Sequence, residues 1–279
     1  MAKRKDAVEI KNLDPFHSVV PYVMPKRTEA EVSSTETFDI TKLMKYIDKA
    51  NKKREKGKEL KLFHCICYVF AKTIYLRPKM NIFIAGRKYW QRNDISLSFV
   101  AKQKFDDKSD EVLLFMKVKP EMTIEDVSKI IIGDVNKARK QSGNDLDKTM
   151  DFVGKLPRFL LTFIFWVIGR LEYYGLMPES LSKGDPNYST LLLSNLGSIG
   201  AGAPYHHLSN YGTCSMMATI GTYIKDTVKK KILLPITIIF DERIADGFYF
   251  AKSLRIAKYI FEHPEELEKP ISSPVDVEL

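Results

Sequence analysis

Two short polar turns carry residue types suited to acid–base and oxyanion chemistry. Ser194 and Asn195 end a short apolar run, and the residues from Asp241 to Gly247 follow a longer apolar run. A serine hydroxyl can donate a hydrogen bond to a developing oxyanion, and a carboxylate can accept a proton from an attacking group. Because rigid elements on either side of a turn hold its side chains in place, these two turns form the candidate site.

The apolar pattern predicts both strands and helices around these turns. Alternating apolar residues indicate strands, and apolar residues three and four positions apart indicate helices. The predicted strands cover 31–39, 95–101, 111–118, 190–194, 215–223 and 232–240, and the predicted helices cover 39–56, 60–75, a segment from 123 and a segment after 247. Strands 95–101 and 111–118 are expected to form a hairpin around a turn at 106–110.

The N-terminal segment is predicted to be extended and without a helix. Pro15, Pro21 and Pro25 follow one another at short intervals, and proline interrupts helical hydrogen bonding.

Composition indicates a globular protein that is expected to form a single domain over 1–279. The chain has 44 Lys plus Arg and 35 Asp plus Glu, a formal net charge of +9, and 44% hydrophobic residues. The basic excess is spread along the chain apart from Lys49 to Lys61, and no nucleic-acid-binding motif accompanies it, so nucleic acid is not an expected partner. Three cysteines, two of them in an apolar run, and no recognisable secretory signal favour the cytoplasm.

Metal and nucleotide sites are not expected. His206 and His207 are adjacent, but no further ligands stand at zinc-binding spacing around them. The glycine-rich run from Gly197 to Gly202 follows a predicted strand, yet no lysine or helix start follows at the spacing of a phosphate-binding loop.

An unusually apolar segment covers 155–183 and is predicted to be an additional helical part of the domain. Its uninterrupted apolar core, from Phe159 to Ile168, is about half of the ~20 residues needed to span a membrane. Such a segment must be covered, and contact with the core or with another subunit is the favoured interpretation. A helix on a membrane surface and a wall for an acyl chain remain alternatives.

Three motifs, in matching order along the chain, resemble those of the acyltransferase component of 2-oxoacid dehydrogenase complexes and of chloramphenicol acetyltransferase. The run 241–247, Asp-Glu-Arg-Ile-Ala-Asp-Gly, resembles the family motif His-x-x-x-Asp-Gly. The run 193–200 resembles the family's Ser-Asn-Leu-Gly stretch, and 78–81, Pro-Lys-Met-Asn, resembles its Pro-x-x-Asn. The resemblance extends from about residue 9 to residue 268.

This resemblance implies a chloramphenicol acetyltransferase-like α+β fold, with a mixed sheet flanked by helices, that assembles as a homotrimer with active sites between subunits. In that family a histidine takes the proton from a thiol or hydroxyl, the activated group attacks an acyl thioester, and a Ser or Thr hydroxyl donates to the oxyanion. It implies a coenzyme A thioester as substrate and no tightly bound cofactor. The sequence has no lipoyl or subunit-binding domain before residue 9, so a lipoyl substrate on the same chain is not expected.

The resemblance also assigns residues to roles. Ser194 matches the hydroxyl donor, with Asn195 beside it, and Asp246 and Gly247 match the Asp-Gly of the motif. In the family the aspartate is a structural ion-pair residue. Its expected partner in this chain is Arg27 or Lys26 in the N-terminal segment.

Glu242 stands where the family has its histidine. A carboxylate in water is a weaker base than an imidazole; burial would strengthen it, whereas a salt bridge with Arg243 would weaken it. Glu242 is therefore either a working base or part of a structural or vestigial site. His206 or His207, in the loop after Ser194, is an alternative base, although histidines in such loops are commonly surface residues.

Two functions follow from these residues. The first is a stand-alone acyltransferase that moves an acyl group from a coenzyme A thioester to a thiol, hydroxyl or amine, and retention of both turns favours it slightly. The second is a catalytically inactive trimeric module that binds coenzyme A or a lipoylated partner, and the glutamate at position 242 favours it.

Overall fold

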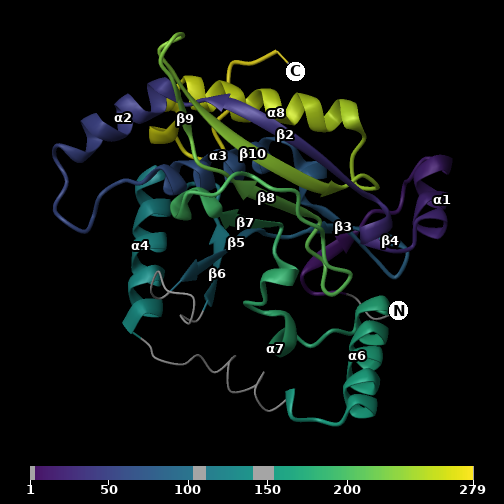
Figure 1. The fold of residues 1–279 in the computed structure, drawn as a ribbon. Coiled ribbons are helices and arrows are strands. Elements are labelled where there is room, and N and C mark those ends of the chain that lie inside the picture. The colour runs from purple at the N-terminus through teal and green to yellow at the C-terminus, as the bar shows by residue number, and fades with distance from the viewer. Residues whose placement is uncertain (1–3, 103–110, 141–153, 279) are drawn as a thin grey trace.

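A mixed β-sheet forms the centre of the molecule (Figure 1). The structure, a computed structural model, describes residues 4–102, 111–140 and 154–278. The strand order in the sheet is β2-β10-β8-β7-β5-β6, with the short β9 paired to β10. Its strands are β2 (Glu31–Asp39), β5 (Ile95–Lys102), β6 (Glu111–Val118), β7 (Leu191–Asn195), β8 (Met216–Ile220), β9 (Ile224–Asp226) and β10 (Lys231–Asp241).

Both strand orientations occur in this sheet, as the resemblance implies. Strand β7 runs parallel to β5 and to β8, whereas the pairs β2–β10, β8–β10 and β5–β6 are antiparallel. The predicted hairpin of β5 and β6 is therefore confirmed, and its turn at 106–110 lies outside the described residues. A second sheet has the order β1-β4-β3. Its strands are β1 (Ala7–Glu9), β3 (Ile82–Ala85) and β4 (Lys88–Arg92).

Helices cover one face of the central sheet, and they hold most of the core there. These helices are α2 (Thr41–Asn51), α3 (Leu62–Leu76), α4 (Ile124–Lys140) and α8 (Gly247–Glu262). Every second residue of the inner strands, such as Leu191, Leu193 and Ile238, packs against them in one large apolar cluster. Cys65 and Cys67 are buried in α3, where they act as small apolar side chains.

The opposite face of the sheet is covered differently. Leu192, Met217 and Ile239 lie on it and form a small separate cluster with Leu208 from the loop between β7 and β8. Helix α6 (Arg158–Tyr173) and the short α7 (Glu179–Ser182) occupy the apolar segment predicted over 155–183, and Figure 1 shows α6 beside the body of the molecule, near the N-terminus. No side chain of α6 is fully buried.

The N-terminal segment differs from the prediction because it contains helix α1 (Pro15–Val23). Pro15 stands in the first turn of α1, where a backbone N–H has no partner within the helix and proline is tolerated. Asp14 caps this helix by accepting a hydrogen bond from the His17 N–H at 3.0 Å. Pro21 lies inside α1, so the prediction that these prolines exclude a helix was wrong. The helix predicted over 39–56 is also shorter, because α2 ends at Asn51.

Candidate active site

The turn from Asp241 to Gly247 joins the end of β10 to the start of α8. Asp246 is the N-cap of α8, and its carboxylate accepts a hydrogen bond from the Tyr249 N–H at 2.7 Å. Gly247 is the first residue of the helix. An aspartate at this position accepts a hydrogen bond from an otherwise unpaired N–H, and its negative charge is stabilised by the positive end of the helix dipole. Asp246 therefore fixes where α8 begins.

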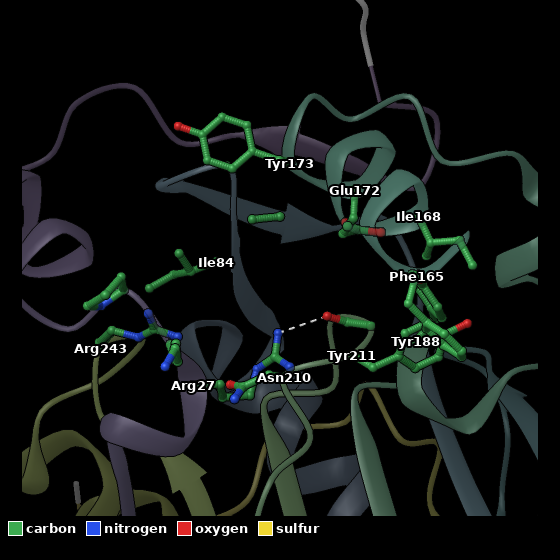
Figure 2. Close-up of a pocket in the computed structure, with 16 residues that line it drawn as sticks. Arg27, Ile84, Phe165, Ile168, Glu172, Tyr173, Tyr188, Asn210, Tyr211 and Arg243 are labelled. Atoms are coloured by element: carbon green, nitrogen blue, oxygen red, sulfur yellow. Dashed lines mark hydrogen bonds between the residues drawn. The ribbon is translucent and has the colours of Figure 1, made fainter. Parts of the chain in front are cut away.

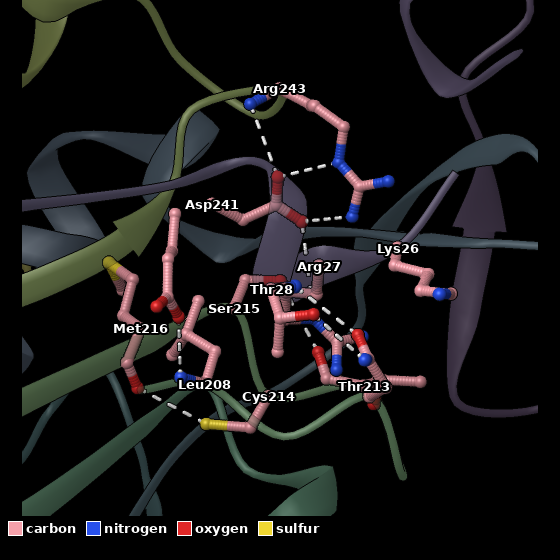
Figure 3. Close-up of polar contacts among 12 residues, drawn as sticks. Lys26, Arg27, Thr28, Leu208, Thr213, Cys214, Ser215, Met216, Asp241 and Arg243 are labelled. Carbon is pink, nitrogen blue, oxygen red and sulfur yellow. Dashed lines mark hydrogen bonds and ion pairs between the residues drawn. The ribbon is translucent and has the colours of Figure 1, made fainter. Parts of the chain in front are cut away.

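The buried ion pair of this turn belongs to Asp241 rather than to Asp246 (Figure 3). Asp241 is 0% exposed and accepts hydrogen bonds from Arg243 Nε at 2.7 Å and Nη2 at 2.6 Å. Arg27 Nε lies 3.9 Å from Asp241 Oδ2. The prediction that Asp246 pairs with Arg27 or Lys26 was therefore wrong, because the carboxylate of Asp246 lies outward at the helix start while Asp241 points inward.

Arg27 connects this turn to the loop that precedes β8. It is 5% exposed, and its guanidinium donates to the carbonyl oxygens of Ser209 and, at 3.0 Å, of Gly212. Burial lowers the pKa of Arg27, and the negative charge of Asp241 opposes that effect. Arg243 and Arg27 both form ion pairs with the single carboxylate of Asp241.

Glu242 lies between these buried neighbours but is itself exposed. Its backbone N–H donates to the Ala30 carbonyl at 2.8 Å, which holds the turn against the start of β2. Within the described part of the chain, no hydrogen bond or ion pair involves its carboxylate. Glu242 is therefore free to meet a group from outside the chain.

Ser194 lies at the end of β7 on the sheet face opposite the helices. It pairs with Thr219 of β8, Thr219 pairs with Thr237 of β10, and Thr237 pairs with Thr35 of β2. Directly paired residues point to the same face, so the four hydroxyl side chains form a row across the sheet. We call Thr35, Thr237, Thr219 and Ser194 the hydroxyl row.

Two members of the hydroxyl row, Thr35 and Thr237, are hydrogen-bonded, whereas Thr219 is not. Thr35 and Thr237 share a hydrogen bond of 2.8 Å, and Thr237 donates to the Ala203 carbonyl at 2.6 Å. The buried Thr219 hydroxyl has no hydrogen-bond partner among the described residues. The three threonines were not predicted as part of the site. Their alternation with apolar residues is visible in the sequence, but it does not reveal which strands are neighbours.

Backbone packing explains the glycine beside Ser194 and Asn195. A Cβ atom on Gly197 would lie 2.4 Å from the carbonyl oxygen of Gly221, so a side chain at position 197 would push the two loops apart. This close approach brings the end of β7 next to the end of β8. Asn195 is half-buried at the start of this turn.

His206 and His207 lie in the loop between β7 and β8, which crosses the sheet face opposite the helices; we call this the open face. Their rings stack with centroids 5.0 Å apart, both are exposed, and His206 Nδ1 accepts a hydrogen bond from the His207 N–H at 2.9 Å. The loop begins at the hydroxyl row, where Ala203 accepts from Thr237. At Leu208 the loop reaches the C-terminal end of β10, where the Leu208 N–H donates to Oε2 of Glu31, the residue paired with Asp241, at 2.8 Å. The two histidines therefore lie on the Glu242 side of the open face.

Ser194 and Glu242 of one chain do not meet. Thr237 and Asp241 are four residues apart on β10, and β7 is two strands away from β10. At ~3.3 Å per residue and ~4.8 Å per strand, Ser194 and the end of β10 are roughly 16 Å apart. One reacting atom cannot contact both residues within a single chain.

No group of three or more His, Cys, Asp or Glu side chains among the described residues could hold a metal ion. Within those same parts of the chain, no helix is long and apolar enough to cross a membrane.

Comparison with solved structures identifies the fold. A probable dihydrolipoamide acetyltransferase from Listeria monocytogenes superimposes with a TM-score of 0.60 and 16% identity, over 92% of this chain and 95% of that chain. The chain has the fold of dihydrolipoamide acetyltransferase cores. Chloramphenicol acetyltransferase matches with a TM-score of 0.57 and 11% identity, over 91% of this chain and 99% of that one. No family model matches the sequence, and no curated protein matches it.

A third solved structure has the same fold. The Azotobacter vinelandii dihydrolipoamide acetyltransferase matches with a TM-score of 0.59 and 14% identity, over 93% of this chain and 94% of that chain. In that enzyme a serine, a histidine and an asparagine have been studied for their role in the catalytic mechanism, the last two four positions apart. These likenesses confirm the predicted chloramphenicol acetyltransferase-like fold, and with it an acyltransferase-type architecture.

Proposed function

We propose that the chain is an acyltransferase that moves an acyl group from a coenzyme A thioester to a thiol, hydroxyl or amine, in a site shared between two copies. One observation carries this proposal. The Ser194 hydroxyl at the end of β7 and the exposed Glu242 carboxylate just beyond the end of β10 are roughly 16 Å apart within one chain, so a site that uses both residues requires a second copy.

The chemistry needs two contacts and a final proton transfer. The carboxylate of Glu242 from one copy takes the proton of the acceptor as the acceptor attacks the thioester carbonyl carbon. The Ser194 hydroxyl of the other copy donates a hydrogen bond to the carbonyl oxygen as negative charge develops on it. When the tetrahedral intermediate collapses, the carbon–sulfur bond breaks and the coenzyme A thiolate takes up the proton from Glu242.

Asp246 and Arg243 support this site without touching the reactants. Asp246 sets the first turn of α8, and Arg243 with Asp241 anchors the residues on either side of Glu242. Both therefore position the carboxylate of Glu242. Gly247 continues directly into the helix.

Self-association is part of the proposal. This chain also matches the cubic core of a pyruvate dehydrogenase multienzyme complex, with a TM-score of 0.56 and 12% identity. We expect a homotrimer, and light scattering should therefore report roughly three times the chain mass of 32.1 kDa. A monomer at micromolar concentration would remove the shared site.

A second candidate is an inactive module that binds coenzyme A or a lipoylated partner. The exposure of Glu242 in the single chain favours it, because a carboxylate becomes a good base only where its surroundings raise its proton affinity. Under the first candidate, the neighbouring copy must supply those surroundings.

Release of coenzyme A from a panel of acyl-CoAs, with dihydrolipoamide, amines and alcohols as acceptors, separates the two candidates. The acyltransferase proposal predicts turnover that Glu242→Gln abolishes while coenzyme A binding persists. Glu242→His should retain or raise turnover, and Glu265→Gln, an exposed glutamate beyond α8, is the matched control.

The remaining outcomes of this assay are also informative. No turnover with any pair favours the binding module. Turnover that survives Glu242→Gln but is lost in His206→Ala or His207→Ala would move the base into the loop.

A further inference from the structure

Helix α6 has two faces with different surroundings. Its inner face forms one wall of a pocket of about 330 Å³, which Arg27 lines from the body of the molecule (Figure 2). On this face Glu172 forms an ion pair with the buried Arg4. A Cβ atom on Gly86 would lie 2.1 Å from the carbonyl oxygen of Tyr173, so the C-terminal end of α6 rests directly on the β3–β4 turn. These contacts fix the orientation of α6 on the molecule.

The other face of α6 carries a line of exposed aromatic rings. Its members recur at the spacing of one helix face, and we call them the aromatic stripe: Phe159, Phe163, Trp166, Arg170 and Tyr174. Phe159 is 76% exposed and Trp166 is 61% exposed. Helical geometry places the centre of the stripe roughly 130° around the axis from the α6 residues that line the pocket. The stripe therefore faces away from the pocket and is exposed in the described part of the chain.

Contacts within the aromatic stripe fix its shape. The rings of Phe163 and Trp166 stack with centroids 6.1 Å apart. The Arg170 guanidinium lies 6.0 Å from the ring centroid of Trp166 and 5.3 Å from that of Tyr174. It also donates a hydrogen bond to the Tyr174 hydroxyl at 3.2 Å, and such cation–π contacts hold an arginine beside aromatic rings. The stripe is therefore a preformed surface about 22 Å long, at ~1.5 Å per residue.

The charges next to the aromatic stripe are positive. Lys155, Arg158 and Arg170 are exposed, and none of them forms an ion pair with a described residue. The one carboxylate of α6 belongs to Glu172, which lies on the inner face and is already paired. The exposed side of α6 therefore combines aromatic rings with basic side chains and has no acidic one.

Helix α1 adds a second exposed apolar surface next to the same turn. Phe16 and Val23 are each 72% exposed. The guanidinium of Arg87, in the β3–β4 turn, lies 4.7 Å from the ring centroid of Tyr22 in α1. Because α6 rests on Gly86 of that turn, both helices reach one turn, and Figure 1 shows them on the same side of the molecule. The exposed apolar area therefore extends beyond a single helix.

We propose that the aromatic stripe and α1 rest on the surface of a membrane that contains anionic lipids. Aromatic side chains favour the boundary between lipid headgroups and acyl chains, and each nearby Lys or Arg adds attraction to anionic headgroups. At ~24 Å, α6 is shorter than the ~30 Å hydrocarbon core of a bilayer, so it lies along the surface and does not cross it.

A second copy of the chain is a poorer occupant of this surface. Each copy has a net charge of +9, and α6 offers no unpaired carboxylate that basic residues of another copy would bind. Membrane binding does not depend on acyl transfer, so this proposal stands or falls separately from the function above.

Co-sedimentation of the full chain with lipid vesicles tests the proposal. Phosphatidylcholine vesicles with about 30% phosphatidylglycerol should bind the chain at least ~10-fold more tightly than vesicles of phosphatidylcholine alone. Salt at ~0.5 M should weaken this binding, because it screens exposed charges. No binding to the anionic vesicles would overturn the proposal, and equal binding to both kinds of vesicle would contradict the role of the basic residues.

Tryptophan fluorescence locates the contact, since the chain has two tryptophans. Trp90 is 9% exposed and its indole N–H donates to the Ala85 carbonyl at 3.0 Å, so Trp166 is the tryptophan that can enter lipid. Anionic vesicles should therefore shift the emission to shorter wavelength, and Trp166→Phe should still bind but lose the shift. Binding of wild type without a shift would place the membrane contact away from α6 and overturn the assignment.

Paired substitutions separate the aromatic stripe from the rest of the surface. Trp166→Glu should weaken binding to anionic vesicles at least ~10-fold, whereas Val228→Glu, at an exposed apolar residue between β9 and β10, should leave it unchanged. Arg170→Gln should reduce the preference for anionic vesicles, and Arg255→Gln on α8 should not. Equal effects within either pair would contradict the proposal, and thermal unfolding reports whether each variant is folded. If wild type binds no vesicles and Trp166→Glu lowers the mass in light scattering, the stripe is a contact between copies and the proposal is overturned.

Discussion

Replacing Asp241 should destabilise the protein far more than replacing Asp246, although the two aspartates lie in one turn. Asp241 is fully buried and accepts hydrogen bonds from the backbone and side chain of Arg243. Asp241→Asn removes the charge and leaves Arg243 and the nearby Arg27 buried without a carboxylate. Asp246→Ala removes only a helix cap at the surface.

Magnitudes follow from these environments. Breaking a buried ion pair by removing one partner costs ~3–5 kcal/mol, whereas losing an N-cap aspartate costs ~1 kcal/mol. For a chain of this size, each kcal/mol lowers the melting temperature by ~2–4 °C. We therefore expect Asp241→Asn to lower the melting temperature by roughly 10 °C, and Asp246→Ala by roughly 3 °C.

Differential scanning calorimetry of the two variants and wild type measures the comparison. Asp246→Asn is the control, because asparagine also caps helices and should leave the melting temperature nearly unchanged. An Asp246→Ala variant that melts at or below the Asp241→Asn variant would contradict the assignment of the buried ion pair to Asp241.

Three further predictions concern stability and the attachment of α6. Burial lowers the pKa of His64 to about 4, so the folded state resists protonation of this side chain. The free energy of unfolding should therefore be highest above pH ~6.5, the pKa of an unperturbed histidine, and should fall by about 3 kcal/mol as the pH drops towards 4. His64→Asn, which retains an acceptor for the Lys61 N–H, should flatten that part of the urea-denaturation profile, and an unchanged profile would contradict it. Lys72→Met removes the buried ammonium 3.1 Å from the Glu266 carboxylate, which keeps its ion pair with the more exposed Lys269, and should cost up to ~3 kcal/mol. Glu266→Gln in the same chain should recover part of the loss, and strictly additive effects in a double-mutant cycle would exclude a coupled pair. Gly86→Ala should speed proteolysis within α6 because its Cβ collides with Tyr173, whereas Gly169→Ala meets open space and should not; equal cleavage rates would refute the contact.

Sequence periodicity was sufficient for most elements of the fold. The strands at 31–39, 95–101 and 232–240 and the helices beginning near 60 and 123 are all present, because their apolar residues repeat at the spacing of the face that they bury. Helix α1 was missed because the sequence rule treats every proline as a break, whereas Pro15 takes the first-turn position that tolerates it.

The candidate site was only partly predictable. The motifs indicated both turns. The buried ion pair could not be assigned from them, because whether Asp241 or Asp246 points inward depends on the register of β10 against β2. The hydroxyl row depends on the same register across four strands, since its members are far apart in sequence. The pocket beside α6 was not predicted, because the apolar run of 157–181 reveals neither its contact with Gly86 nor the position of Arg27.

Complementation between two inactive variants tests the shared site most directly. Ser194→Ala and Glu242→Gln should each abolish coenzyme A release when alone. In a mixed trimer, a site that takes Ser194 from one copy and Glu242 from its neighbour is intact with a probability of ~1/4 at equal amounts. Co-expression of the two variants should therefore restore about a quarter of the wild-type rate, because 1/2 × 1/2 of the sites combine two unaltered residues. A mixture as inactive as either variant alone, when wild type is active and subunit exchange is verified by mass spectrometry, would contradict a site built from two copies.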